Sequence, residues 1–303
     1  MATPSLVPHA LLLAMIAIWG GSYAAAKAAL DSLSPYALVA LRFWIGLACL
    51  VPFLGRNARA DLAASRAHGL LAGGVLAAGY LLQFVGMNET SASTGGFIAG
   101  LIVLLVAVGG AFWFRTPLGP RAAVGLSAGL AGMVMLCWPK DAAGVGAGAA
   151  QDTVRGISLQ IASTVSYAMH ILLLTRHGRG KPAMAYCTWQ LALVSVAATV
   201  AAVVDGRFAK MPGTAVEWTL PLLFQVGYLG FLATALGIAV QSKVQHRIPS
   251  THAALLFATQ PLFAALIAWA TLGDRMERLQ LVGGVTIVAG VVLTSLDRRA
   301  AGQ

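Results

Sequence analysis

Residues 251–293 read THAALLFATQ PLFAALIAWA TLGDRMERLQ LVGGVTIVAG VVL and contain two apolar runs separated by a short charged turn. The first run, His252 to Leu272, carries no formal charge and can cross a hydrocarbon layer of about 30 Å at about 1.5 Å per helical residue. The turn, residues 273–278, holds four charges, and a second apolar run follows from Leu281 to Leu293. The stretch predicts two membrane-spanning helices joined by a hairpin in water.

The dipeptide Gln260-Pro261 lies near the middle of the first run. A proline there removes one backbone hydrogen bond and clashes with the carbonyl group of Phe257, so the helix should bend. We therefore expect Pro261 to act as a hinge. An amide side chain is costly in contact with lipid, so we expect Gln260 to face an internal cavity near the membrane midplane.

The whole chain has the composition of a polytopic membrane protein. It has 303 residues, of which 58% are hydrophobic and only 10% are charged, whereas soluble domains have about 25% charged residues. The predicted fold class is an all-α membrane protein with ten transmembrane helices. The apolar runs of spanning length are residues 8–30, 35–54, 68–87, 93–114, 118–138, 155–175, 183–204, 219–242, 250–272 and 279–296.

The positive charges lie between these runs, and their distribution predicts an orientation. Most of the 20 Lys and Arg residues fall on one side if the amino terminus is cytoplasmic. We therefore expect a multi-pass protein of the inner (plasma) membrane with both termini in the cytoplasm. The net charge of +10 then reflects topology and requires no nucleic-acid partner. The three cysteines lie in apolar runs without CxxC spacing, so we expect no disulfide, metal or cofactor.

The two halves of the chain repeat each other at matched spacing. The corresponding features are Trp19-Gly20 with Tyr167-Ala168, Pro35 and Arg42 with Pro182 and Trp189, and Gly125 and Gly132 with Gly283 and Gly290. Each repeat holds five spans, and because five is odd the second copy enters the membrane from the opposite side. The predicted organisation is a first repeat at 1–138, a linker at 139–154, an inverted second repeat at 155–296 and a tail at 297–303. Inverted repeats recur in secondary transporters.

These features resemble the drug/metabolite transporter superfamily, and in particular its ten-helix exporters with two EamA-type repeats. The resemblance covers about residues 9–296. The residues that carry it are Trp19-Gly20, Ser34-Pro35 with Arg42, Pro261 with Leu272-Gly273-Asp274, and Gly283 to Gly290 with Val291. The first copy departs from the pattern, because Leu104 stands where the fourth helix often has proline and Arg115-Thr116-Pro117 replaces a Leu-Gly-Glu turn.

Polar and aromatic stripes run along two corresponding helices. The first helix carries Trp19, Ser22 and Tyr23 on one face, and the sixth carries Ser163, Tyr167 and His170 at helical spacing. A stripe of this kind is costly against lipid, so we expect both to line a central cavity. The alternative is hydrogen bonding between helices without a substrate, and for His170 in particular a hydrogen-bonded core position is the stronger interpretation.

Three more helices contribute candidate substrate-binding residues. They are Tyr80 and Gln83 on the third predicted helix, Gln225 and Tyr228 on the eighth, and Gln260 on the ninth. The resemblance implies that the third, fourth, eighth and ninth helices line the pathway, with Tyr80, Gln83 and Phe97 in its outer half. For each pair, simple helix-to-helix bonding explains the residues equally well.

Arg42 and the glycine stripes each allow two interpretations. Arg42 could form a structural ion pair with Glu89 or Asp31, or it could bind a carboxylate. The glycines around Gly132 and Gly290 permit close backbone approach and could pack the two halves together or form a dimer face; we favour internal packing and a monomer.

The leading functional hypothesis is an exporter of small metabolites that works by alternating access. None of the ten predicted spans contains an acidic residue in its middle, so zwitterions and neutral aromatics suit the cavity better than organic cations. Amino acids, and aromatic ones in particular, are the favoured substrates. A multidrug or other metabolite exporter is the main alternative. A passive channel and an intramembrane enzyme are weaker alternatives. The inverted repeat and the mid-helix proline argue against a channel, and the spans contain no metal-binding acidic cluster or activated nucleophile for an enzyme.

Overall fold

The computed structural model of the chain describes residues 6–90, 98–115, 119–136, 153–211, 215–260, 262–263, 266–267 and 278–295. Over these ranges the protein is built from helices, and the extended contact between them is a single bridge that pairs Leu33 with Ala209. Six of the helices are long and apolar enough to span a membrane, and shorter apolar helices accompany them. The chain is therefore an all-helical, multi-pass membrane protein.

The helices follow one another through the chain as the apolar runs predict. Their bounds are α1 Val7–Ala29, α2 Pro35–Leu50, α3 Ala58–Met87, α5 Ile102–Phe114, α6 Pro120–Leu136, α7 Val154–His177, α8 Ala183–Asp205, α9 Leu220–Gly227, α10 Gly237–Val244, α11 Ser250–Ala258 and α13 Arg278–Ser295. Two short 3-10 helices, η1 Val51–Phe53 and η3 Gln245–Arg247, and the π-helix η2 Tyr228–Leu236 complete the order.

Several helices begin at the residues that the sequence favours. The Ser34 hydroxyl accepts a hydrogen bond from the backbone amide of Ala37 (3.2 Å), and Pro35 follows as the first helical residue of α2. Thr153 and Thr219 cap α7 and α9 in the same way. These caps fix where the chain enters each helix.

The helix α3 begins ten residues before the predicted span, at Ala58 instead of residue 68. The added turns contain Arg59, Asp61 and Arg66, which interrupt an apolar run but not a helix. The predicted spans at 93–114 and 250–272 lie only partly within the described residues, and Pro261 lies outside them.

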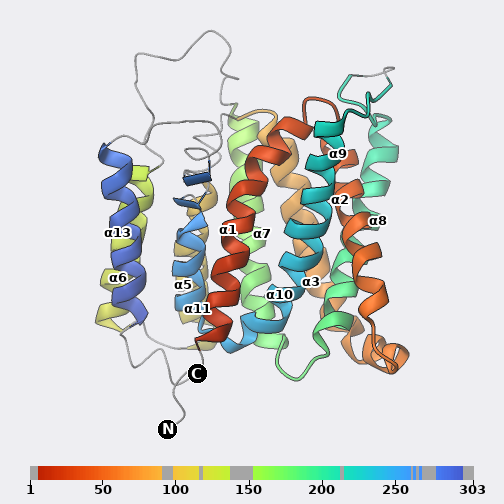
Figure 1. The fold of residues 1–303 in the computed structure, drawn as a ribbon. Coiled ribbons are helices and arrows are strands. Elements are labelled where there is room, and N and C mark those ends of the chain that lie inside the picture. Colours follow the sequence, from red (N-terminus) through yellow and green to blue (C-terminus); the bar gives the residue numbers. More distant parts are fainter. Residues whose placement is uncertain are drawn as a thin grey trace.

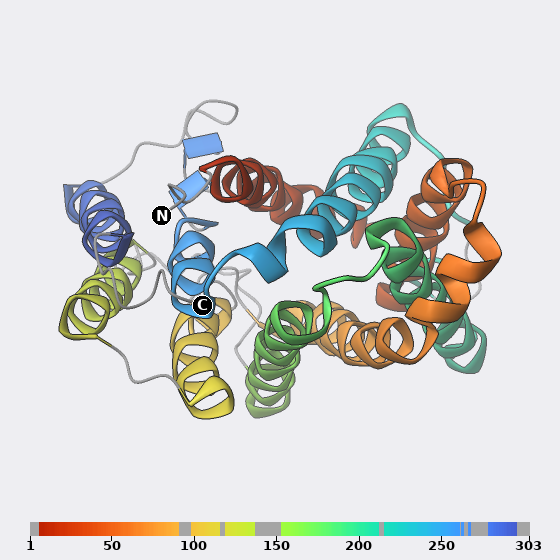
Figure 2. The same cartoon turned by 90° about the horizontal axis from the view of Figure 1, so that it is seen from below.

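The helices stand side by side (Figure 1), and seen along their axes they form an elongated cross-section (Figure 2). The pair α6 and α13 occupies one end of this section, and α2 and α8 lie toward the other. Near the middle, α1 and α7 lie on opposite sides. Extensive contacts join α6 to α13, α3 to α7 and α8, α2 to α8 and η2, and α5 to α11.

Glycines bring α6 and α13 together backbone against backbone. A Cβ atom added at Gly132 would lie 2.6 Å from the carbonyl oxygen of Gly283, and one at Gly290 would lie 2.5 Å from that of Gly125. Only glycine permits so close an approach. The expectation that these stripes serve internal packing is confirmed.

Two large apolar clusters and a small one of Ala72, Leu174 and Tyr186 form the interior of the described part of the chain. One gathers α2, α3, α8 and the end of α1, around Phe43, Leu76 and Leu191. The other joins α5, α7, α11 and the start of α1, around Leu12, Val106 and Phe257. The outer faces expose large apolar side chains such as Phe112 (88% exposed) and Val204 (82% exposed), as expected of surfaces that contact lipid.

The helix from Leu220 to Arg247 is interrupted by nine residues of π-helix, Tyr228–Leu236. In this segment the Thr234 hydroxyl donates to the carbonyl oxygen of Leu229 (2.7 Å), five residues earlier. Such widened turns are rare and often occur at functional sites. This one packs against α1 and α2, and its residues Ala233 and Thr234 accept hydrogen bonds from Trp19 and Arg42.

Candidate functional site

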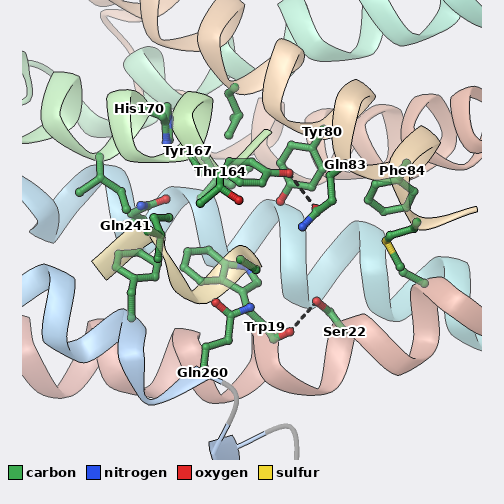
Figure 3. Close-up of a pocket in the computed structure, with 18 of the residues that line it drawn as sticks. Trp19, Ser22, Tyr80, Gln83, Phe84, Thr164, Tyr167, His170, Gln241 and Gln260 are labelled. Carbon is green, nitrogen blue, oxygen red and sulfur yellow. Dashed lines mark hydrogen bonds between the residues drawn. The ribbon is translucent and has the colours of Figure 1, made fainter. Parts of the chain in front are cut away.

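A cavity of about 140 Å³ lies between the two apolar clusters. Its volume is close to that of a protein cavity of about 150 Å³ that holds one benzene molecule. The lining residues are Trp19, Ser22 and Ala26 of α1; Arg42 of α2; Leu76, Tyr80, Gln83, Phe84 and Met87 of α3; Ala99 and Ile102; Thr164, Tyr167, His170 and Ile171 of α7; Ile238 and Gln241 of α10; and Phe257 and Gln260. Figure 3 shows Trp19 and Gln260 on one side, with Tyr80, Gln83 and Tyr167 opposite.

The α3 and α7 side of the cavity is held by one hydrogen bond and an aromatic contact. The hydroxyl of Tyr167 donates to the amide oxygen of Gln83 (2.9 Å), and its ring meets Tyr80 edge to face at 5.4 Å. Gly79 makes room for this ring, because a Cβ atom there would lie 2.8 Å from Cε1 of Tyr167. Tyr167 of α7 and the pair Tyr80 and Gln83 of α3 thus form one wall of the cavity.

Trp19 forms the opposite wall. Its indole nitrogen donates to the carbonyl oxygen of Ala233 in the π-helix (2.6 Å), and its ring stacks on Phe257 with centroids 6.1 Å apart. Gly237 makes room for the indole, because a Cβ atom there would lie 2.7 Å from Nε1. Each wall therefore consists of an aromatic ring that rests on a glycine of another helix.

His170 lines the cavity and belongs to a buried chain of polar side chains. Its Nε2 lies 2.7 Å from the amide oxygen of Gln190, whose nitrogen donates to the hydroxyl of Ser242 (3.2 Å). All three residues are buried, which links α7, α8 and α10. The hydrogen-bonded core position that the sequence favoured for His170 agrees with this geometry.

Arg42 is the only charged side chain among the described lining residues, and it is 3% exposed. Its Nε donates to the hydroxyl of Thr234 in the π-helix (2.9 Å), and its guanidinium carbon lies 4.8 Å from the centroid of the Tyr80 ring. Glu89 and Asp31, the two acids considered as partners, instead pair with Arg155 (2.6 Å) and Lys210 (3.1 Å). The ion pair considered for Arg42 is therefore not formed with either acid.

The structure brings most of the predicted site residues together and separates others. Around the cavity lie Trp19, Ser22, Tyr80, Gln83, Tyr167, His170 and Gln260. Three residues are not in its lining. Ser163 donates to the carbonyl oxygen of Gln160 in its own helix, Tyr228 donates to the carbonyl oxygen of Ile18, and Gln225 is half-buried on α9. Phe97, Pro261 and the side chain of Tyr23 lie outside the described residues.

Other lining residues were not identified from the sequence, although the same helical spacing could have found several. Phe84 follows Tyr80 by four residues, and Phe257 precedes Gln260 by three, so each shares a helical face with a predicted residue. Gln241 is an uncharged polar residue inside an apolar run, which is the signal that selected Gln83. Thr164 precedes Tyr167 by three residues and so shares its helical face as well. Its hydroxyl donates to the carbonyl oxygen of Gln160 in its own helix.

The chemistry of the described lining suits reversible binding. It combines five Trp, Tyr and Phe rings with amides, hydroxyls, one imidazole and one guanidinium, and none of the described lining residues is acidic. Within the described ranges, no group of three His, Cys, Asp or Glu side chains could hold a metal ion. A cavity of this kind can enclose an aromatic ring and bind a polar group beside it.

Comparison with known proteins agrees with a transport role. An archaeal protein of Archaeoglobus fulgidus, named only as an uncharacterized transporter, is 24% identical over 94% of this chain and 84% of its own length. An Escherichia coli protein named "probable amino-acid metabolite efflux pump" is 23% identical over 95% of each chain. A solved crystal structure aligns with a TM-score of 0.76 at 20% identity, over 97% of this chain and 99% of the other, and so shares the fold.

The model of the EamA-like transporter family matches the chain twice, over residues 7–138 and 154–296. The two matches cover nearly all of the sequence, so the resemblance to this family is confirmed. The chain belongs to the EamA-like transporter family and carries two EamA repeats.

Proposed function

We propose that this transporter exports small metabolites, most favourably aromatic amino acids, by alternating access through the central cavity. The observation that carries the proposal is the composition of the lining. Trp19, Tyr80, Tyr167 and Phe257 offer ring faces, Gln83 and Gln260 offer amides, and no described lining residue is acidic. Ring stacking stabilises a bound aromatic by about 0.5–1.5 kcal/mol per contact.

The charge of the lining supports zwitterionic or anionic substrates over organic cations. A cation entering the cavity would meet the buried Arg42 and, in the described lining, no acidic counter-charge. Like charges in a region of low dielectric repel strongly. The printed name of the Escherichia coli relative, an amino-acid metabolite efflux pump, supports the same class of substrate.

The mechanism rests on two inverted five-helix repeats, 1–138 and 155–296, joined by residues 139–154 and followed by a short tail at 297–303. Reciprocal contacts support this arrangement. Gly132 approaches Gly283 while Gly290 approaches Gly125, and Gly79 accommodates Tyr167 while Gly237 accommodates Trp19. In each case the second contact is the first with the roles of the halves exchanged, as a two-fold axis in the membrane plane requires.

The helix contacts follow the same exchange. The contact of α3 with α7 corresponds to that of α10 with α1, and the contact of α5 with α7 corresponds to that of α11 with α1. We expect rocking of the two repeats about the cavity to open each side in turn, with Pro261 as a hinge. The expected setting is the inner (plasma) membrane, with both termini cytoplasmic and the protein working as a monomer.

Counterflow in proteoliposomes tests the proposal. Vesicles loaded with unlabelled phenylalanine should accumulate labelled phenylalanine transiently from outside, because an alternating-access carrier exchanges substrate across the membrane. Trp19→Ala should abolish most of this exchange, whereas Trp44→Ala should retain it, since Trp44 is 45% exposed and is not in the lining.

Three results would contradict the proposal. Flux without counterflow would indicate a channel. Counterflow of quaternary amines but not of amino acids would indicate a cation exporter. Equal loss of folded protein in Trp19→Ala and Tyr167→Ala would assign both rings a structural role only.

A further inference from the structure

Arg42 is buried, but only part of its guanidinium group is hydrogen-bonded. It lies on α2, 3% exposed, and lines the cavity. A guanidinium group has five N–H donors, and of these the Nε–H is bonded to Thr234 at 2.9 Å. Within the described part of the chain, no hydrogen bond or ion pair uses its two terminal nitrogens.

Aromatic rings surround the guanidinium where an acid would be expected. Its central carbon lies 4.8 Å from the ring centroid of Tyr80, 5.6 Å from that of Phe43 and 5.7 Å from that of Phe84. Ring faces attract a cation of this kind, because the face of an aromatic ring carries partial negative charge. These rings contact the guanidinium group, but they offer no hydrogen-bond acceptor to the N–H groups of its two terminal nitrogens.

A buried cation without an anionic partner is unfavourable unless a partner arrives from elsewhere. The two acids that the sequence suggests as partners form ion pairs with other residues, Glu89 with Arg155 and Asp31 with Lys210. The remaining partner is a ligand in the cavity. Carboxylates suit the free donors, because two parallel N–H groups of a guanidinium match the two oxygens of a carboxylate.

We propose that the terminal nitrogens of Arg42 bind the carboxylate of the transported substrate, and that Thr234 positions the guanidinium from the π-helix. The substrate ring then lies against the aromatic walls of the same cavity. This inference rests on the proposed function and narrows it to substrates that carry both a ring and a carboxylate. Arg42 is thus a specificity-determining residue on α2, a helix that contributes no other described residue to the lining.

Three ligands separate the contributions of the carboxylate and the ammonium group. Phenylalanine carries both, 3-phenylpropionate keeps only the carboxylate, and phenylalaninamide keeps only the amine. Binding to the purified full-length protein can be followed by tryptophan fluorescence, since Trp19 lines the cavity. The wild type should bind phenylpropionate more tightly than phenylalaninamide.

The variants Arg42→Gln and Arg42→Lys test the role of the guanidinium. Arg42→Gln should weaken phenylpropionate binding on the order of 10- to 100-fold and leave phenylalaninamide binding unchanged or stronger. Arg42→Lys should fall between, because an ammonium keeps the charge but not the paired donors. Thr234→Val, which removes the acceptor for Nε, should lower the preference for phenylpropionate by a few-fold. Lys210→Gln, a surface cation, should match the wild type.

The outcomes distinguish this inference from the proposed function. The carboxylate-binding role of Arg42 is wrong if the wild type and Arg42→Gln bind phenylpropionate equally well. It is also wrong if the wild type does not bind phenylpropionate, even when phenylalanine is exchanged. If phenylpropionate binding depends on Arg42 but phenylalanine is not exchanged, Arg42 binds carboxylates as proposed and amino-acid export is refuted. If Arg42→Gln does not fold, the test uses the ratio of phenylpropionate to phenylalaninamide affinity in Arg42→Lys and Thr234→Val. A ratio equal to that of the wild type in both variants contradicts the carboxylate-binding role of Arg42.

Discussion

Adding one methyl group at Gly79 or Gly237 should displace an aromatic wall of the cavity. The new Cβ atom would lie 2.8 Å from Cε1 of Tyr167 in Gly79→Ala and 2.7 Å from Nε1 of Trp19 in Gly237→Ala. Ordinary contacts of this kind begin near 3.4 Å, so either the ring moves or the two helices separate. Overpacking of this kind costs about 1–3 kcal/mol.

Two other glycines of the same helical segments provide controls. A Cβ atom at Gly74 of α3 would meet Leu193 at an ordinary 3.7 Å, and one at Gly227 of α9 would meet nothing within 4 Å. All four substitutions gain helix propensity of up to about 1 kcal/mol. The difference between Gly79→Ala and Gly74→Ala, or between Gly237→Ala and Gly227→Ala, therefore isolates the cost of displacing the ring.

Unfolding in mixed micelles with increasing denaturing detergent measures this difference, which should be about 1–3 kcal/mol in each pair. In vesicles the affinity for substrate should fall by up to about tenfold, which corresponds to about 1.4 kcal/mol, while the two controls exchange substrate like the wild type. If Gly79→Ala and Gly237→Ala match their controls in both assays, the rings are not held against these glycines and the account of the walls is wrong.

Other contacts between helices lead to two further predictions. Tyr167→Phe and Gln83→Leu each remove the 2.9 Å hydrogen bond and should weaken substrate binding by about 0.5–1.5 kcal/mol; because they break the same bond, the double variant should be no weaker than the worse single one, and additive losses would contradict a shared role. Gly132→Ala and Gly290→Ala should destabilise the protein more than Gly129→Ala, because their Cβ atoms would lie 2.6 and 2.5 Å from backbone carbonyl oxygens, whereas that of Gly129 would meet a leucine methyl group at 3.1 Å. Equal unfolding free energies in the three variants would refute the backbone contact.

The long helices were predictable because a membrane span leaves a strong signal in the sequence. About 20 apolar residues must follow one another wherever a helix crosses the hydrocarbon layer, and α1, α7 and α8 begin and end within two residues of the predicted spans. The start of α3 was not predicted, because charged residues end an apolar run without ending a helix. The π-helix was not predicted either, since the residues of Tyr228–Leu236 form an ordinary apolar sequence.

The cavity residues that the sequence predicted correctly are those whose polar or aromatic side chain would be costly against lipid. Trp19 and Tyr167 share faces with polar residues, so periodicity alone directed them inward. The same reasoning also selected Ser163 and Tyr228, which hydrogen-bond to backbone carbonyl groups outside the lining, because a polar stripe is wider than the arc of a helix that faces the cavity. For Arg42 the sequence left two interpretations open, since the partners of Glu89 and Asp31 come from distant segments.

The π-helix Tyr228–Leu236 affects the direction in which the side chains of the following helix, α10, point. Each residue advances an α-helix by about 100°, and widened turns absorb residues that would otherwise rotate the next segment. Beyond the π-helix, Ile238 and Gln241 of α10 line the cavity. Deleting a single residue from the π-helix should therefore let the segment close into a regular α-helix while Ile238 and Gln241 keep their direction, whereas one residue deleted from a regular α-helix turns every following side chain by about 100°. The corresponding part of α3 is a regular α-helix, so the two halves reach the same cavity with different windings.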